Sequence, residues 1–344
     1  MNLIDKSVIP GPLIKMSSPT KMSDRYDQLS LLQLSFAVKN IEMTKQYYKQ
    51  SLELPGFYSF FDLGCSSGLN STKYWSLILD SQPPQSPFYL TFSDLAGNDW
   101  RRVMVNADRF QDLACADHLF FSCKSGSFTK VLMPPGSVNF ITSYSVVHWI
   151  TKLTPTPDSF LAFFSKDPEV SAANAAQARE DLVNYLKARS VELKSGGFLN
   201  FVARAPSAEM ELQYRLMTEL IFEFIAEGRI SMQEFQSFQA ALWVRSLEDY
   251  QAALNQLDDL FELKEYFIYS PAESEEDNLL KDPSTLSNFV RSAHEGRILS
   301  TLKENRGVEE ATATVNLFFT KLTEIYQGHS FEGTYYSYVV LKRK

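Results

Sequence analysis

One stretch near the start of the chain limits the possible folds most strongly. Residues 58–63 are apolar and aromatic apart from Ser59 and Asp62, and Gly64 and Gly68 follow within a short polar segment. Apolar residues at helical spacing resume over 71–79. This order predicts a buried strand, a tight loop and the first turn of a helix. Such a corner binds nucleotide-type cofactors at the carboxyl end of a parallel strand, and glycines without a Cβ let the loop backbone approach a ligand.

The spacing of the two glycines narrows the choice of cofactor. A dinucleotide loop has the pattern G-x-G-x-x-G, and a P-loop has a lysine directly after its last glycine. Here the glycines are four residues apart, an acid precedes the first, and no lysine directly follows the second. A carboxylate at Asp62 repels phosphate and attracts a cation. The loop therefore favours S-adenosylmethionine (SAM), with an ordinary strand–turn–helix corner or a nicotinamide cofactor as alternatives.

Composition excludes several classes of protein. With 344 residues the chain can bury a substantial core, and its net charge of −8 argues against nucleic acid as a partner. The three cysteines lack Cys-x-x-Cys spacing and the four histidines are far apart, so we expect neither a disulfide scaffold nor a metal site. No apolar run approaches the roughly 20 residues that span a bilayer. No signal peptide is evident, so we expect no membrane partner and a cytoplasmic location.

The order of the predicted elements indicates an α/β fold. Strands are predicted at 58–62, 88–92, 119–123, 138–143 (running on to Trp149), 198–202, 263–269 and 335–341, and helices at 26–52, 71–79, 171–194, almost throughout 210–260, and at 308–327. Strands that alternate with helices form a parallel sheet flanked by helices. The second strand leads into Asp94, an acid placed where ribose hydroxyls are commonly held.

These patterns divide the chain into four predicted parts. Residues 1–50 form an N-terminal arm and lid helix, and 51–205 form the α/β core that binds the cofactor. Residues 206–262 form a helical cap, and 263–344 supply the last core strands with further cap helices. The acidic segment 271–282 is most simply a solvated loop.

Five collinear segments resemble the SABATH family, the plant-type methyltransferases that act on salicylic, benzoic and jasmonic acids or on xanthines. Residues 62–70 resemble the family's SAM loop, 93–100 its N-D-L-P-x-N-D-F, 125–128 its P-G-S-F and 145–149 its Y-S-L-H-W. Tyr26, Ser30 and Gln33 match its Y-x-x-x-S-x-x-Q, while Ser145 replaces a family tyrosine and the arm before Tyr26 lacks a glycine-rich segment. The resemblance implies a Rossmann-like class I SAM-dependent methyltransferase sheet with an α-helical cap.

The resemblance also implies a set of residues around SAM and its product, S-adenosylhomocysteine (SAH). Asp62 would favour the cationic end of SAM, Asp94 the ribose hydroxyls, and Phe128 would flank the adenine. Cys65 is expected to pack against the cofactor rather than to react. The full implied set is Tyr26, Ser30, Asp62, Gly64, Cys65, Asn70, Asp94, Leu95, Ser127, Phe128 and Ser143.

For the methyl acceptor the resemblance implies Gln33, His148, Trp149, Tyr214 and Trp243. In the family, the equivalent Gln amide and Trp indole N–H donate to the substrate carboxylate. His148 either touches the acceptor or is a neutral buried imidazole, and Tyr214 and Trp243 either face the acceptor or pack in the core. No catalytic general base is expected, because a carboxylate is already ionised near neutral pH and the protein has mainly to position it.

The prediction is O-methylation of the carboxylate of a small-molecule acid to a methyl ester, with SAM as cofactor. Two alternatives stay open: N-methylation of a small heterocycle, and a non-catalytic binding protein with the same fold. The resemblance also allows a homodimer.

Overall fold

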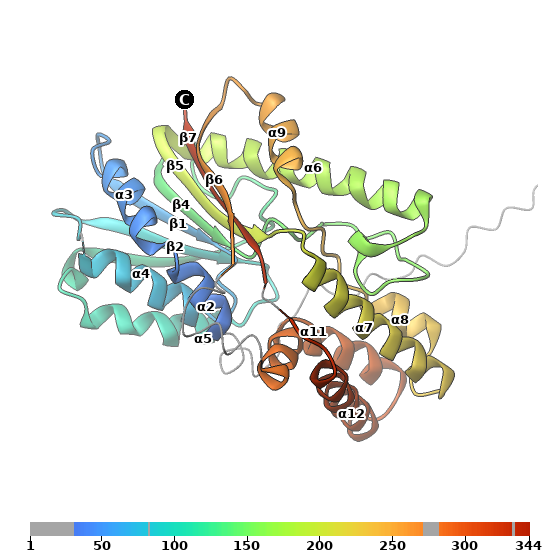
Figure 1. The fold of residues 1–344 in the computed structure, drawn as a ribbon. Helices are drawn as coiled ribbons and strands as arrows, with labels where there is room; N and C mark the ends of the chain where they lie inside the picture. The colour runs from blue at the N-terminus through green and yellow to red at the C-terminus, as the bar shows by residue number, and fades with distance from the viewer. Residues whose placement is uncertain (1–30, 82, 271–281, 332–333) are drawn as a thin grey trace, which may run out of the picture.

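A seven-stranded sheet forms the centre of the computed structural model, which describes residues 31–81, 83–270, 282–331 and 334–344 (Figure 1). The predicted residues Tyr26 and Ser30, and segment 271–281, lie outside the described residues. The strand order is β3-β2-β1-β4-β5-β7-β6. The strands are β1 (Tyr58–Leu63), β2 (Phe88–Asp94), β3 (Leu119–Ser125), β4 (Val138–Tyr144), β5 (Leu193–Arg204), β6 (Phe261–Tyr269) and β7 (Tyr336–Arg343).

The sheet is parallel over its first five strands and antiparallel at one edge. Strands β1 to β5 pair in parallel, and β7 lies antiparallel between β5 and β6. The parallel part confirms the alternating strand–helix pattern. The antiparallel edge is a refinement that the pattern did not predict, because strand direction depends on how the intervening chain returns.

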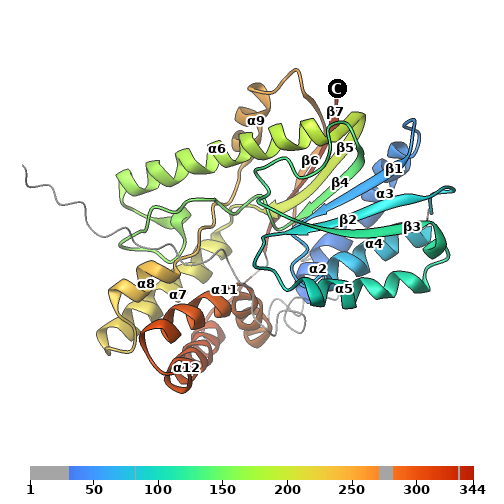
Figure 2. The same ribbon diagram turned by 180° about the vertical axis from the view of Figure 1, so that it is seen from behind.

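Both faces of the sheet are buried. Successive side chains of a strand point to opposite faces, so Phe60 and Phe61 of β1 belong to two different core clusters. One face is covered by α3 (Ile41–Ser51) and α4 (Leu69–Ser81), and the other by α6 (Pro168–Glu192), as Figures 1 and 2 show. Near-continuous apolar strands are expected where both faces are covered.

The predicted single helix at 26–52 is wrong within the described residues. Two helices, α2 (Leu31–Val38) and α3, meet at Asn40, whose backbone is non-helical with φ −109° and ψ 24°. Asparagine competes for backbone hydrogen bonds and disfavours helix interiors. The break allows α2 to take a direction different from that of α3.

The predicted helical region 210–260 is also interrupted. It contains α7 (Ala208–Ala226), α8 (Met232–Phe238) and α9 (Leu247–Asn255), separated by Gly228 at φ 72° and by the non-helical segment 239–246. Serine capping boxes start α8 and α9. Helix α12 (Val308–Gln327) confirms the prediction at 308–327, whereas α11 (Pro283–Asn305) was not predicted. Figure 1 shows α7, α8, α11 and α12 gathered to one side of the sheet.

Strand β4 ends earlier than predicted. Ser145 has φ 58°, a left-handed conformation that stops the strand, and the Trp149 N–H donates to the Val146 carbonyl at 2.9 Å. The chain therefore turns after Tyr144, and Trp149 pairs with Leu242 in an isolated bridge. This turn places His148 and Trp149 beyond the carboxyl end of the strand.

None of the described helices has the length and apolar character needed to cross a membrane.

Candidate active site

The two glycines shape the loop after β1. Gly64 and Gly68 both have φ 82°. A Cβ on Gly64 would lie 2.1 Å from Val146 Cγ2, and a Cβ on Gly68 would lie 3.1 Å from Val103 Cα. The glycines are thus required by the left-handed backbone and by contact with the protein's own chain. The expectation that the loop backbone also approaches a ligand stays a prediction.

Asp94, at the end of β2, joins the loops that follow β1 and β2. Its Oδ2 accepts from the Ser66 N–H and its Oδ1 from the Leu95 N–H, both at 2.7 Å. Asn98 adds a donation from Nδ2 to the Ser66 carbonyl at 2.6 Å. Burial raises the pKa of Asp94. Each carboxylate oxygen keeps a further lone pair, so Asp94 can hold the loops and still accept from a ligand hydroxyl.

Asp62, at the end of β1, is 3% exposed and accepts a hydrogen bond from Thr142. Burial, together with the neighbouring charge of Asp94, raises its pKa to about 6. Neither acid forms an ion pair with a lysine or arginine of the described residues. Two buried acids without a cation disfavour a phosphate and fit a cationic, phosphate-free cofactor such as SAM.

A buried ion pair holds the loop after β3, where Ser127 and Phe128 lie. Arg189 Nε donates to Glu192 Oε2 at 2.6 Å, and both side chains are fully buried. Arg189 also donates to the carbonyls of Phe128 and Lys130, each at 2.7 Å. Glu192 in turn accepts from the backbone N–H groups of residues 132 and 133. Sequence reasoning missed this pair, although Arg and Glu at i, i+3 near the end of a helix are a recognisable signal.

Helix α11 contacts three of the five predicted acceptor residues. Gln33 on α2 donates from Nε2 to Ser292 Oγ at 3.0 Å, and its Oε1 has no partner among the described residues. Tyr214 on α7 bonds to His294 Nε2 at 2.9 Å. The guanidinium of Arg297 lies 5.2 Å above the ring of Trp149. The structure thus brings Gln33, Trp149 and Tyr214 to one helix.

This geometry agrees with a comparison against known families. A family model described as SAM dependent carboxyl methyltransferase matches residues 21–344. The chain belongs to this family. The SABATH resemblance and the SAM-dependent class I fold are thereby confirmed.

Individual members of the family are distant in sequence. Probable jasmonic acid carboxyl methyltransferase 2 of Theobroma cacao is 27% identical over 219 residues, which cover 55% of this chain and 58% of that protein. Methyltransferase FUS9 of Gibberella fujikuroi is 27% identical over 218 residues, covering 61% of this chain and 59% of that protein. The alignments therefore span less than two thirds of either relative.

A solved structure extends the likeness of fold over nearly the whole chain. Loganic acid methyltransferase with SAH matches with a TM-score of 0.77 and 21% identity, covering 95% of this chain and 99% of that one. At that identity the match shows the fold alone.

Within this family member, His148 is a neutral buried imidazole. It is 4% exposed, and its Nδ1 accepts from the Arg204 backbone N–H at 3.2 Å. Burial, together with the charges of Arg204 and Arg245, lowers the pKa of His148 to about 3. Of the two interpretations left open by the sequence, the buried neutral one agrees with these contacts.

Trp243 packs in an apolar cluster next to Phe163. Its ring lies 5.1 Å from Phe163, in an apolar cluster with Ile150, Ala162 and Ala178. Its backbone N–H donates to the His148 carbonyl at 2.7 Å. The described contacts of Trp243 therefore match its interpretation as a core residue rather than an acceptor residue.

The remaining predicted cofactor residues lie around the strand ends. Asn70 is in the first turn of α4, and Ser143 on β4 is in register with Leu63 of β1. Burial raises the pKa of the Cys65 thiol well above its usual range, which disfavours the reactive thiolate form. Phe128 lies 6.0 Å from the ring of Tyr185.

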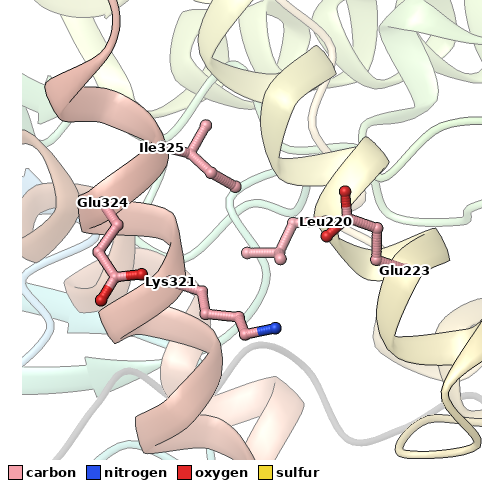
Figure 3. Close-up of a pocket in the computed structure, with 5 residues that line it drawn as sticks. All are labelled: Leu220, Glu223, Lys321, Glu324 and Ile325. Carbon is pink, nitrogen blue, oxygen red and sulfur yellow. The ribbon is translucent and has the colours of Figure 1, made fainter.

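A hollow between α7 and α12 contains none of the predicted site residues (Figure 3). It is lined by Leu220, Glu223, Lys321, Glu324 and Ile325. These residues lie on cap helices rather than on the loops that follow β1, β2 and β4, so we place the candidate active site at the strand ends.

Proposed function

We propose that this chain transfers a methyl group from SAM to the carboxylate of a small organic acid and releases a methyl ester. The family match over residues 21–344 carries this proposal. The buried acids Asp62 and Asp94 support the cofactor, because they favour a cation over a phosphate.

The chain's own residues would position the reactants. When bound, SAM supplies an electrophilic methyl group whose bond to sulfur breaks as its bond to a carboxylate oxygen forms. Asp62 would attract the positive end of the cofactor, and Asp94 would accept from its ribose. Gln33 and Trp149 would donate to the acceptor carboxylate, which needs no general base because it is already ionised. The lowered pKa of the buried His148 is consistent with a site in which Gln33 and Trp149 position the acceptor and no general base is needed.

The same proposal assigns a role to each part of the chain. Residues 51–205 would hold SAM, while α2 and the cap helices after residue 206 would enclose the acceptor. A homodimer and a cytoplasmic location remain predictions that a sedimentation experiment and cell fractionation can test.

Two substitutions separate the sites. Trp149→Phe removes one donor to a charged group, a loss of about 1.5–3 kcal/mol, so we expect kcat/KM for the acid to fall roughly tenfold to hundredfold. The Kd for SAM, measured by calorimetry, should not change.

Asp94→Asn should weaken SAM binding instead. Trp100→Phe on α5 (Trp100–Ala107), whose indole donates to the Ala96 carbonyl, is the matched control and should match the wild type. Unchanged kinetics in Trp149→Phe would remove Trp149 from the acceptor site.

A further inference from the structure

Arg204, the last residue of β5, is a buried cation with unused donors. Arg204 is only 4% exposed, and its Nε and Nη2 atoms have no hydrogen-bond partner among the described residues. No aspartate or glutamate in the described part of the chain forms an ion pair with it. Buried charges in proteins are ordinarily paired.

Two other buried arginines, Arg189 and Arg245, have more hydrogen-bond partners. Arg189 uses Nε, Nη1 and Nη2 on Glu192 and two backbone carbonyls. Arg245 donates to the carbonyls of Val147 and Ala178, and only its Nη2 lacks a described partner. Those two residues hold the fold together, whereas the guanidinium of Arg204 has no comparable set of acceptors.

Aromatic rings surround Arg204 instead of acceptors. Its Cζ lies 5.4 Å from the ring centroid of Phe289 and 5.9 Å from those of Tyr214 and Tyr336. Such contacts attract a cation, but they accept few of its hydrogen bonds and offset only part of the cost of burying it. An anion entering this cage would complete the hydrogen bonding of Arg204.

The position of Arg204 connects it with the proposed acceptor site. Tyr214 bonds to His294 on α11, and the Arg204 backbone bonds to His148, which precedes Trp149. Phe36 on α2 packs on both Phe289 and Tyr336, and it lies one helical turn after Gln33. The cage around Arg204 therefore contacts α2, which carries Gln33, and the Arg204 backbone contacts the turn that carries Trp149.

We propose that Arg204 binds a second anionic group of the methyl acceptor, so that the acceptors are small acids with two negative groups, such as dicarboxylic acids. This inference rests on the proposed function. A guanidinium matches a carboxylate in shape and charge. The reacting carboxylate is better held by Gln33 and Trp149, because an ion pair with arginine would draw electron density from the oxygen that accepts the methyl group.

Binding to the protein saturated with SAH tests the proposal without requiring turnover. The probes are linear dicarboxylic acids of four to ten carbons and the monomethyl ester of each, which has the same length and one charge fewer. For at least one chain length we expect the diacid to bind about tenfold to hundredfold more tightly than its monoester. Equal affinity for both members at every length, or binding of neither, would overturn the proposal.

Variants locate the effect. Arg204→Met keeps the side-chain length without charge and should abolish the preference for the diacid, while Arg204→Lys should keep part of it. The control, Arg291→Met on α11, removes an arginine that pairs with Glu295 and should keep the full preference. The Kd for SAH reports whether each variant is folded. A preference that persists in Arg204→Met would contradict the assignment.

A methyl-transfer assay on the same pairs separates the two proposals. Diacids that bind through Arg204, with no methyl transfer to any acid tested, would contradict the proposed function and leave the binding role of Arg204 standing. Methylation of diacid and monoester with equal kcat/KM would contradict the role of Arg204 and leave the proposed function standing.

Discussion

Two acids at neighbouring strand ends give the candidate site its electrostatic character. Asp62 and Asp94 are both buried, and burial raises the pKa of each. In the free protein the charged form of Asp62 is therefore disfavoured. Its folded pKa of about 6 exceeds the ordinary 3.8, so its cost to stability appears as pH rises through this window. A bound cation would reverse this effect by favouring the charged carboxylate.

The affinity for SAM should accordingly depend on the protonation of Asp62. We expect the Kd to be constant above about pH 7 and to rise as pH falls through about 6, because the proton competes with the cationic ligand. Asp62→Asn should bind SAM weakly and without this dependence. Asp80→Asn, at an exposed acid near the end of α4, is the control and should behave as the wild type. Calorimetric titrations from pH 5 to 8, the range around this pKa, provide the measurement. A wild-type Kd that does not vary over this range would contradict the role given to Asp62.

The sequence was enough to propose which residues line the cofactor site, but not which residues each of them contacts. An acid, two glycines and the start of a helix are local features, and they do lie together after β1. Gly64 is different, because the atom that excludes a side chain there belongs to Val146, which is distant in sequence. The sequence also could not predict that Nε and Nη2 of Arg204 lack hydrogen-bond partners among the described residues, because this depends on how distant acceptors are placed by the fold.

At the scale of elements, α6 holds the loop that carries Ser127 and Phe128. Arg189 and Glu192 sit near its C-terminal end and contact four residues of that loop. Their own pairing is buried, and removing one partner of such a pair leaves a charge without compensation.

Glu192→Gln should therefore lower the free energy of unfolding by about 3–5 kcal/mol and also weaken SAM binding, because the loop loses its anchor. Replacing both residues, as Arg189→Met with Glu192→Leu, should be less destabilising than Glu192→Gln alone. Urea unfolding measures each variant. The control is Glu219→Gln, which breaks the exposed pair with Arg215 on α7 and should cost less than about 1 kcal/mol. A similarly small loss in Glu192→Gln would contradict the anchoring role.

Helix α11 shows why one element was missed by the sequence pattern. Its buried residues include Ser287, Ser292 and His294 beside Leu286 and Phe289, so it has no simple apolar stripe. Ser292 and His294 are buried because they bond to Gln33 and Tyr214. Local signals were nevertheless present, since Asp282 caps the helix and Pro283 occupies its first turn.

At the scale of the whole molecule, the proposed acceptor site would be assembled from parts that are far apart in sequence. Helix α2, the turn after β4, the end of β5, α7 and α11 each supply one or two residues. Figure 1 shows the cap helices gathered at one side of the sheet, and α7 follows directly from the end of β5. The sheet and its cofactor loops follow from patterns of adjacent residues, whereas the acceptor site depends on how the cap folds back.

The most direct measurement of the central claim is the chemical stability of the methylated product. The protein is incubated with methyl-labelled SAM and a panel of monocarboxylic acids, dicarboxylic acids and nitrogen heterocycles, and the product is then treated with mild base. We predict that label passes to an acid and is released by base as methanol, because esters hydrolyse and N-methyl groups do not. Base-stable label on a heterocycle, or no transfer to any acid despite SAM binding, would contradict carboxyl methylation.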